Sequence, residues 1–185
     1  MTTDSKQKIK TLDMVYIAVF AVLIAICTWI SIPAVVPFTM QTFAIFLTVG
    51  VLGGKRGSLA ILIYLLLGAI GMPVFSGFQS GISAILGKTG GYIIGFIFSA
   101  LIMWAMEKLL GKKTWVLAVS MVLGMLTYFF IGTIWFMAVY ARDSGAVGLM
   151  TVLGWCVFPF VIPDLIKMVL ALVLSKRMRR IMKIS

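Results

Sequence analysis

The sequence predicts an all-α integral membrane protein, a single bundle of six transmembrane helices with both termini in the cytoplasm. Hydrophobic residues make up 62% of the 185 residues, and the mean hydropathy is +1.16. A soluble domain of this size cannot bury so much apolar surface. The apolar residues are also grouped into runs, which short segments containing Gly, Pro or cations separate. We therefore expect one membrane domain over residues 1–185.

The apolar runs set the predicted spans. The first, 14–32, is too long for the apolar core of a signal peptide and lacks a small-residue cleavage site. Pro33 and Pro37 punctuate the connection that follows it. The remaining spans are expected at about 38–52, 58–70, 92–106, 115–139 and 163–174.

Two connections are unusual. Residues 71–91 are rich in glycine yet contain apolar side chains, so we expect this connection to pack as a lid. Residues 149–162 are apolar but contain Gly154 and Pro159, which favours a re-entrant or surface-lying segment before the last span.

The basic residues fix the predicted orientation, because cytoplasmic loops of membrane proteins carry the excess of Lys and Arg. One side would hold three in the N-terminal segment, two at Lys55 and Arg56, three in the 107–113 loop and five in the C-terminal tail. The other side would hold Lys88 and Arg142. This asymmetry places both termini in the cytoplasm of a multi-pass protein of the cell membrane, with anionic lipid headgroups as partners of the cations.

This topology brings three connections and the start of the last span together at the outer face. Several of the predicted spans are shorter than the roughly 20 residues that a perpendicular crossing needs. Irregular backbone at membrane depth is tolerated where it lines a cavity. We therefore expect a pocket near the outer face, roofed by the 71–91 connection.

The strongest candidate site is the pair Asp164 and Lys167, which interrupts the apolar run 149–174. Pro163 suits the first position of a helix, so Asp164 is expected in the first turn, near the positive end of the helix dipole, and Lys167 one turn later. A charge at bilayer depth costs roughly 2.5–3.5 kcal/mol on insertion scales. Such a pair is expected to face a ligand or water-filled cavity; a structural ion pair between helices is the alternative.

Other polar and aromatic side chains are expected at the outer ends of the predicted spans. Thr39 and Gln41 open the second span and offer hydrogen bonds, although helix capping is an alternative role. Phe75 and Gln79 lie in the 71–91 connection, where the Phe ring is suited to stacking on a ligand or to core packing. Lys88 and Tyr92 flank the glycines at the start of the fourth span.

The sequence excludes several function classes. Gly87-Lys88-Thr89 lacks the glycine at the spacing that a phosphate-binding loop requires. The chain contains no His and no paired carboxylates, and Cys27 and Cys156 both lie in apolar runs. We therefore predict no enzyme, no metal site, no cofactor and no nucleic-acid binding. A chain that moves a solute would have to be passive or to borrow its energy source from partners.

Small residues in the first span indicate close helix packing. Ala21 and Ala25 are four residues apart, and Ala18 extends the pattern. Such spacing lets another helix approach closely. It is a weak indication of a partner, because alanine is common in membrane helices.

The ordered set of motifs resembles the BioY family. The segments that carry the resemblance are Pro37–Thr42, Gly53–Gly57, Gly71–Phe75, Gly90–Phe96 and Pro163–Lys167, and the likeness extends over about 14–174. Lys88 departs from the family pattern, which often has Pro before the Thr-Gly-Gly-Tyr segment.

The resemblance implies a biotin-specific S component of an energy-coupling factor (ECF) transporter. It implies six helices, a pocket near the outer face that contains Asp164 and Lys167, and a docking surface on the first span at Ala18, Ala21 and Ala25. The partners would be a transmembrane coupling subunit and two ATPase subunits.

The chemistry of biotin agrees with these residues. A ureido ring offers two N–H donors and a carbonyl, so Asp164 is suited to accept from it and Lys167 to donate or to fix Asp164. Gln41, Gln79, Tyr92 and the Phe residues are suited to the remaining contacts, and Lys88 or Arg142 to the carboxylate. An S component for another vitamin and a non-transport assembly protein of the membrane remain alternatives; a channel fits poorly because no continuous polar lining is visible.

Overall fold

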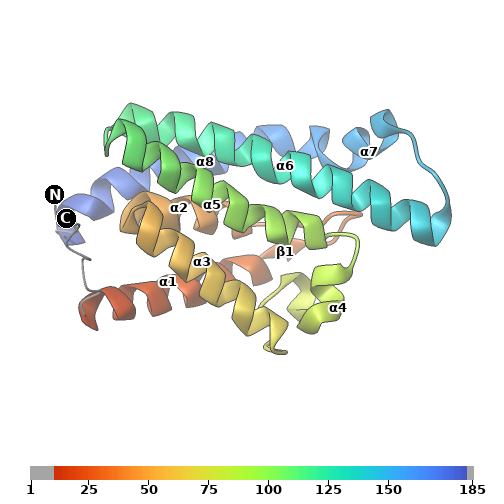
Figure 1. Cartoon of the computed structure of the whole chain (residues 1–185), viewed down its shortest axis with the longest axis horizontal. Coiled ribbons are helices and arrows are strands. Elements are labelled where there is room, and N and C mark those ends of the chain that lie inside the picture. The colour runs from red at the N-terminus through yellow and green to blue at the C-terminus, as the bar shows by residue number, and fades with distance from the viewer. Residues whose placement is uncertain (1–10, 183–185) are drawn as a thin grey trace, which may run out of the picture.

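The computed structural model describes residues 11–182 and is almost entirely helical (Figure 1). Its elements follow in the order α1 (Thr11–Trp29), β1 (Ser31–Ile32), β2 (Phe38–Thr39), α2 (Gln41–Leu52), α3 (Gly54–Ala69), η1 (Ser76–Phe78), α4 (Gly81–Leu86), α5 (Gly90–Leu110), α6 (Thr114–Ser144), α7 (Leu149–Cys156) and α8 (Phe158–Met182). The predicted N-terminal cations Lys6, Lys8 and Lys10, and Lys183 of the tail, lie outside the described residues.

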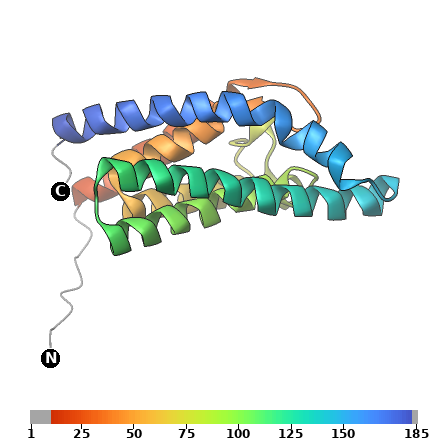
Figure 2. The same cartoon turned by 90° about the horizontal axis from the view of Figure 1, so that it is seen from above.

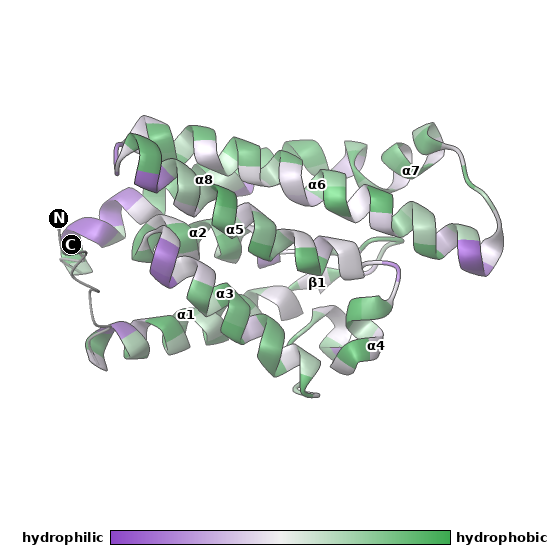
Figure 3. Ribbon diagram, in the orientation of Figure 1, coloured by the Kyte–Doolittle hydropathy of each residue, from purple (hydrophilic) through white to green (hydrophobic). Residues whose placement is uncertain are grey.

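Each predicted span has a helix at its place in the chain, but the lengths differ. Within residues 11–182, α1, α5, α6 and the combined segment 149–182 are long and apolar enough to cross a membrane. The helices α2 and α3 have 12 and 16 residues and are joined at Gly53. Many large apolar side chains are exposed on the outside of the bundle, which suits a lipid environment. Hydrophobic residues accordingly dominate most helices in Figure 3.

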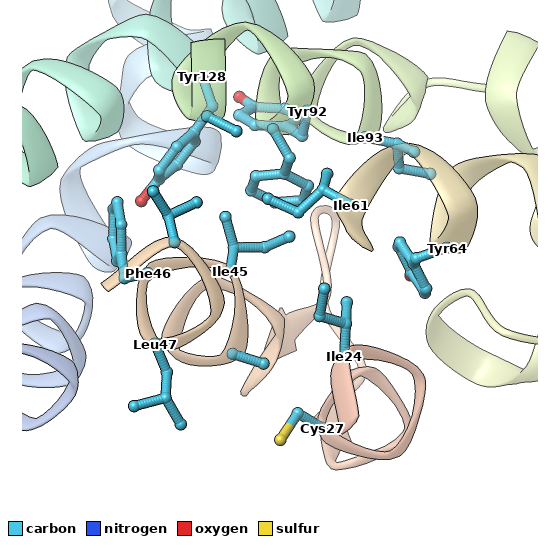
Figure 4. Packing of buried hydrophobic residues seen from close by; sticks show 14 of the residues in the cluster. Ile24, Cys27, Ile45, Phe46, Leu47, Ile61, Tyr64, Tyr92, Ile93 and Tyr128 are labelled. Atoms are coloured by element: carbon cyan, nitrogen blue, oxygen red, sulfur yellow. The ribbon is translucent and has the colours of Figure 1, made fainter. Parts of the chain in front are cut away.

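The core lies where α1, α2, α3, α5 and α6 meet (Figure 4). Ile24, Ile45, Phe46 and Ile61 are essentially inaccessible there. The helices α5 and α6 form an antiparallel pair, joined by a short loop at 111–113 and lying side by side in both views (Figures 1 and 2). They approach closely at Gly95, where a Cβ would lie 2.9 Å from the Cα of Tyr128.

The connection after α1 and the 71–91 connection contain regular structure that the sequence analysis did not predict. After α1 the chain forms a two-residue antiparallel ladder, with Ser31 opposite Thr39 and Ile32 opposite Phe38. The 71–91 connection contains η1 and the short helix α4. Trp29 of α1 ties this connection down, since its indole N–H donates to the Pro73 carbonyl at 2.9 Å and its ring stacks on Phe78 at 5.3 Å.

The start of the last helix corrects the prediction for Pro163. The helix begins at Phe158 instead, so Pro163 lies inside α8, and Asp164 lies in its second turn. The break that was expected at Pro163 occurs at Val157, whose backbone separates α7 from α8. Pro159 takes the first-turn position, where its missing N–H has no intrahelical partner to lose. The segment expected to be re-entrant is thus helix α7 followed by the first turn of α8.

The two ends of the bundle differ in their content of basic residues, and the segments named next can be located in Figure 3. The α2–α3 turn, the α5–α6 loop and the end of α8 lie at one end and contain most of the described Lys and Arg residues. Two acids hold helices together at that end. Asp13 pairs with Arg56 at 3.2 Å, and the Glu107 carboxylate accepts from the Gly54 N–H at 2.5 Å.

The close approach at Gly95 gives a stability prediction. Gly95→Ala inserts a methyl group against the α6 backbone, and overpacking of this kind costs about 1–3 kcal/mol. We expect a lower thermal unfolding midpoint in mild detergent. Gly154→Ala is the matched control, because a Cβ at this α7 position meets nothing within 4 Å. Equal midpoints for the two variants would contradict the packing described for α5 and α6.

Candidate ligand-binding pocket

A cavity of about 700 Å³ lies at the end of the bundle opposite the basic loops. Its volume is within the range typical of small-molecule sites. Its walls come from the start of α2, the start of α5, the middle of α6, the end of α7, and α8, and the β1–β2 segment and the 71–91 connection contribute the rest. All eight predicted ligand-contacting residues line it: Thr39, Gln41, Phe75, Gln79, Lys88, Tyr92, Asp164 and Lys167.

Asp164 and Lys167 form a buried ion pair in the cavity wall. The Lys167 Nζ lies 2.9 Å from Asp164 Oδ1, and the two side chains are 6% and 3% exposed. They are one turn apart on α8, so the helix itself sets their separation. Because isolated charges are strongly disfavoured away from water, each needs the other and further hydrogen bonds.

The lysine uses all three of its donors within the protein. In addition to Asp164, Nζ donates to the Thr39 carbonyl at 2.7 Å and to Thr42 Oγ1 at 3.3 Å. It also lies 3.9 Å from the centre of the Phe38 ring. An ammonium has three N–H groups, so Lys167 has no donor to spare unless one of these contacts breaks. Its role in this state is to hold Asp164 and the start of α2.

The aspartate retains one acceptor position. Oδ1 accepts from Lys167 and from the Thr42 hydroxyl at 2.9 Å, and Oδ2 accepts from the Tyr128 hydroxyl at 2.5 Å. A carboxylate offers about four lone-pair sites, of which these bonds use three. The remaining site is on Oδ2, so of the two charged groups Asp164 is the one able to bind a donor without breaking a contact.

The sequence analysis did not place Tyr128 or Thr42 among the site residues. Tyr128 lies in the middle of the apolar run of α6, where a tyrosine ordinarily serves as a packing residue. Its hydroxyl reaches Asp164 where α6 contacts α8, and no sequence pattern displays that contact. Thr42 directly follows Gln41 in the sequence, and that place was the available signal.

The α2 end of the wall is anchored by two hydrogen bonds. The Gln41 backbone N–H donates to Thr39 Oγ1 at 3.2 Å, so Thr39 does bond to the first turn of α2, which was its alternative role. The Gln41 side chain donates to the Tyr64 hydroxyl at 2.9 Å. Thr39 and Gln41 are 9% and 6% exposed and line the cavity from these fixed positions.

The opposite wall carries Lys88 and Tyr92. The Lys88 ammonium is exposed and lies 4.9 Å from the centre of the Tyr140 ring, which holds it near the rim. The Tyr92 hydroxyl is buried and has no hydrogen bond within 3.5 Å among the described residues, although Thr133 and Cys156 lie near it. Arg142, the other candidate for an anionic group, does not line the cavity and pairs with Asp143 at 3.4 Å.

The small residues of α1 do not form one exposed stripe. Ala21 and Ala25 are 2% and 5% exposed and pack inside the bundle, whereas Ala18 is exposed. Val22 and Ile26 share the exposed side of α1. The docking surface at Ala18, Ala21 and Ala25 stays a prediction, and of the three alanines only Ala18 is exposed in this structure.

Comparison with known proteins identifies the family. The family model described as the BioY family matches residues 2–184. The chain belongs to the BioY family. The biotin transporter BioY of Thermotoga maritima is 37% identical over 170 residues, covering 91% of this chain and 96% of that protein. The probable biotin transporter BioY of Pyrococcus horikoshii is 38% identical over 171 residues, covering 92% and 98%.

The BioY assignment extends to the fold. A crystal structure described as the S-component for biotin from an ECF-type ABC transporter matches with a TM-score of 0.81 and 28% identity, over 97% of this chain and 95% of that one. The resemblance seen in the sequence is thereby confirmed. The relatives are named as transporters, in agreement with the prediction that the chain is not an enzyme.

The ion pair gives a prediction for stability. Asp164→Asn leaves the buried Lys167 ammonium without its counter-ion, which costs about 3–5 kcal/mol. Replacing both residues, Asp164→Asn with Lys167→Met, removes the unpaired charge and should recover much of that loss. We expect the double variant to unfold in detergent at a higher temperature than Asp164→Asn alone. If the double variant were no more stable than Asp164→Asn, the main role of Asp164 in stability would not be to pair with the Lys167 charge.

Proposed function

We propose that this chain is the biotin-binding subunit of an uptake system that an ATP-driven ECF module powers. It would lie in the cell membrane with six spans and both termini in the cytoplasm. The charge difference between the two ends of the bundle supports this orientation, since it puts the basic end inside and the cavity outside. The partners would be a transmembrane coupling subunit and two ATPase subunits.

The observation that carries the proposal is the ion pair in the cavity wall with one free acceptor. Asp164 Oδ2 has room for one donor, and the ureido ring of biotin offers N–H groups. A neutral polar ring adds no third charge to a buried pair, so binding avoids a further desolvation penalty of the kind that an ion pays. The aromatic side chains of Phe75, Tyr92 and Phe96 provide apolar surface for the thioether ring.

The carboxylate of biotin is assigned to Lys88 rather than Arg142. Lys88 lies at the rim and is exposed, so it can meet an anion without losing a buried partner. Arg142 already contacts Asp143 and lies outside the lining. A ligand with its ring near Asp164 and its chain directed to Lys88 would use both walls of the cavity.

The coupling subunit is proposed to dock on the exposed side of α1. Ala18 remains available there with Val22 and Ile26, whereas Ala21 and Ala25 are covered by the chain itself. Lipid would cover this side in the isolated subunit. The docking surface is thus narrower than the sequence pattern implied.

A ligand-binding assay tests the proposed function. We expect the purified protein in mild detergent to bind radiolabelled biotin, and unlabelled biotin to compete more effectively than other vitamins. The Asp164→Asn, Lys167→Met double variant should remain folded and lose binding. No competition by unlabelled biotin would support an S component for another vitamin. Undiminished biotin binding by the folded double variant would instead show that the ion pair only stabilises the structure.

The carboxylate assignment has its own test. Lys88→Gln removes the rim cation, so we expect about a 3- to 10-fold loss of biotin affinity and little change for the uncharged biotin amide. Arg142→Gln is the matched control and should leave both affinities unchanged. An equal loss for biotin and its amide, or a larger effect at Arg142, would contradict the assignment.

A further inference from the structure

Tyr64 of α3 lies behind the pocket wall and does not line the cavity. Its side chain is fully buried (Figure 4), and its ring packs edge-on against Phe75, with centroids 5.7 Å apart. Its hydroxyl meets groups from three other segments. Gln41 Nε2 lies at 2.9 Å, the Val74 carbonyl at 3.1 Å and Thr28 Oγ1 at 3.3 Å.

The groups around the Tyr64 hydroxyl determine which of them donates and which accepts in each hydrogen bond. The Thr28 hydroxyl donates to the Ile24 carbonyl at 2.7 Å, so its oxygen can only accept from Tyr64. The Val74 carbonyl can also only accept. The single proton of Tyr64 must therefore go to one of these two groups. The Tyr64 hydroxyl has no second proton that it could donate to the Gln41 carboxamide oxygen. Gln41 must therefore donate its carboxamide N–H to the tyrosine oxygen.

The oxygen of Gln41 is consequently free to face the cavity. Gln41 lines the cavity, and its Oε1 has no hydrogen bond from any residue within 11–182. Among the described residues, four buried side-chain polar atoms lack a hydrogen-bond partner, and Gln41 Oε1 is not one of them. Because Oε1 has no partner either, it is not buried, so protein atoms do not enclose it. The wall at Gln41 thus offers an acceptor, in addition to the free position on Asp164 Oδ2.

We propose that Tyr64 is a positioning residue that fixes the Gln41 carboxamide with its oxygen toward the ligand. The pocket would then select a ligand with an N–H donor at that point and disfavour one with an acceptor there. The inference rests on the proposed function, since the ureido N–H groups of biotin would supply the donor. The Val74 carbonyl, 3.1 Å away, also places the 71–91 connection beside the same hydroxyl.

A double-mutant cycle in biotin affinity tests the positioning role. We expect Tyr64→Phe to weaken biotin binding about 3- to 10-fold by freeing the Gln41 carboxamide to turn. In a Gln41→Ala background the same change should have little further effect. Tyr16→Phe is the matched control, as Tyr16 is a partly buried tyrosine of α1 that does not line the cavity. Equal losses from Tyr64→Phe in both backgrounds, or none in either, would overturn the proposal.

A ligand-side measurement covers the case in which Tyr64→Phe does not fold. Biotin is compared with analogues methylated at one or the other ureido nitrogen, in the unaltered protein and in Gln41→Ala. We expect methylation of one nitrogen to weaken binding several-fold in the unaltered protein, and this penalty to shrink in Gln41→Ala. If the loss of affinity on methylation were the same in Gln41→Ala as in the unaltered protein at both nitrogens, the positioning role of Tyr64 would be overturned. The proposed function would not be affected by that result. Failure of the unaltered protein to bind biotin would overturn the proposed function, and this inference with it.

Discussion

The Asp164–Lys167 ion pair is the constraint on which the cavity end of the structure depends. Two charges 2.9 Å apart and nearly inaccessible to water are stable only when hydrogen bonds satisfy both. Thr39 of β2, Thr42 in the first turn of α2 and Tyr128 of α6 supply those bonds. The pair therefore fixes three helices relative to one another at the cavity wall, and the shape of the wall follows from the need to satisfy it.

Polar groups at different depths of the cavity are held in different ways. The deep groups are enclosed in networks, with Asp164 held by three donors and Gln41 held by Tyr64. The rim group Lys88 is exposed and contacts an aromatic face. Such an arrangement fixes the deep acceptors in place and leaves the Lys88 ammonium exposed at the rim, which suits the proposed binding of a neutral polar ring with a charged tail. Preorganised acceptors lower the cost of binding, since little side-chain freedom is lost when a ligand enters.

The sequence predicted the features that depend on composition and missed those that depend on packing between distant segments. Asp164 and Lys167 stood out because charges are costly in an apolar run. Pro163 was wrongly placed at a helix start, because Pro159 provides a second acceptable first-turn proline and the break falls at Val157. Tyr64 and Tyr128 carried no signal, since a tyrosine in an apolar helix usually packs without a specific hydrogen bond.

The α1 alanines show a related limit. A small-xxx-small pattern states that a helix approaches closely, but it does not state whether that helix belongs to the same chain. In this structure Ala21 and Ala25 are buried within the chain's own bundle, and Ala18 alone of the three is exposed. The family resemblance located the pocket region, whereas the hydrogen-bond partners of each side chain came only from the structure.

An experimental structure with biotin bound tests the central claim most directly. The account predicts that the ureido ring lies against Asp164, with an N–H group on Oδ2, and that the Lys167 ammonium keeps its contacts to Asp164 and the Thr39 carbonyl. A ring bound elsewhere in the cavity, with the Asp164–Lys167 pair unchanged and out of contact with the ligand, would contradict it.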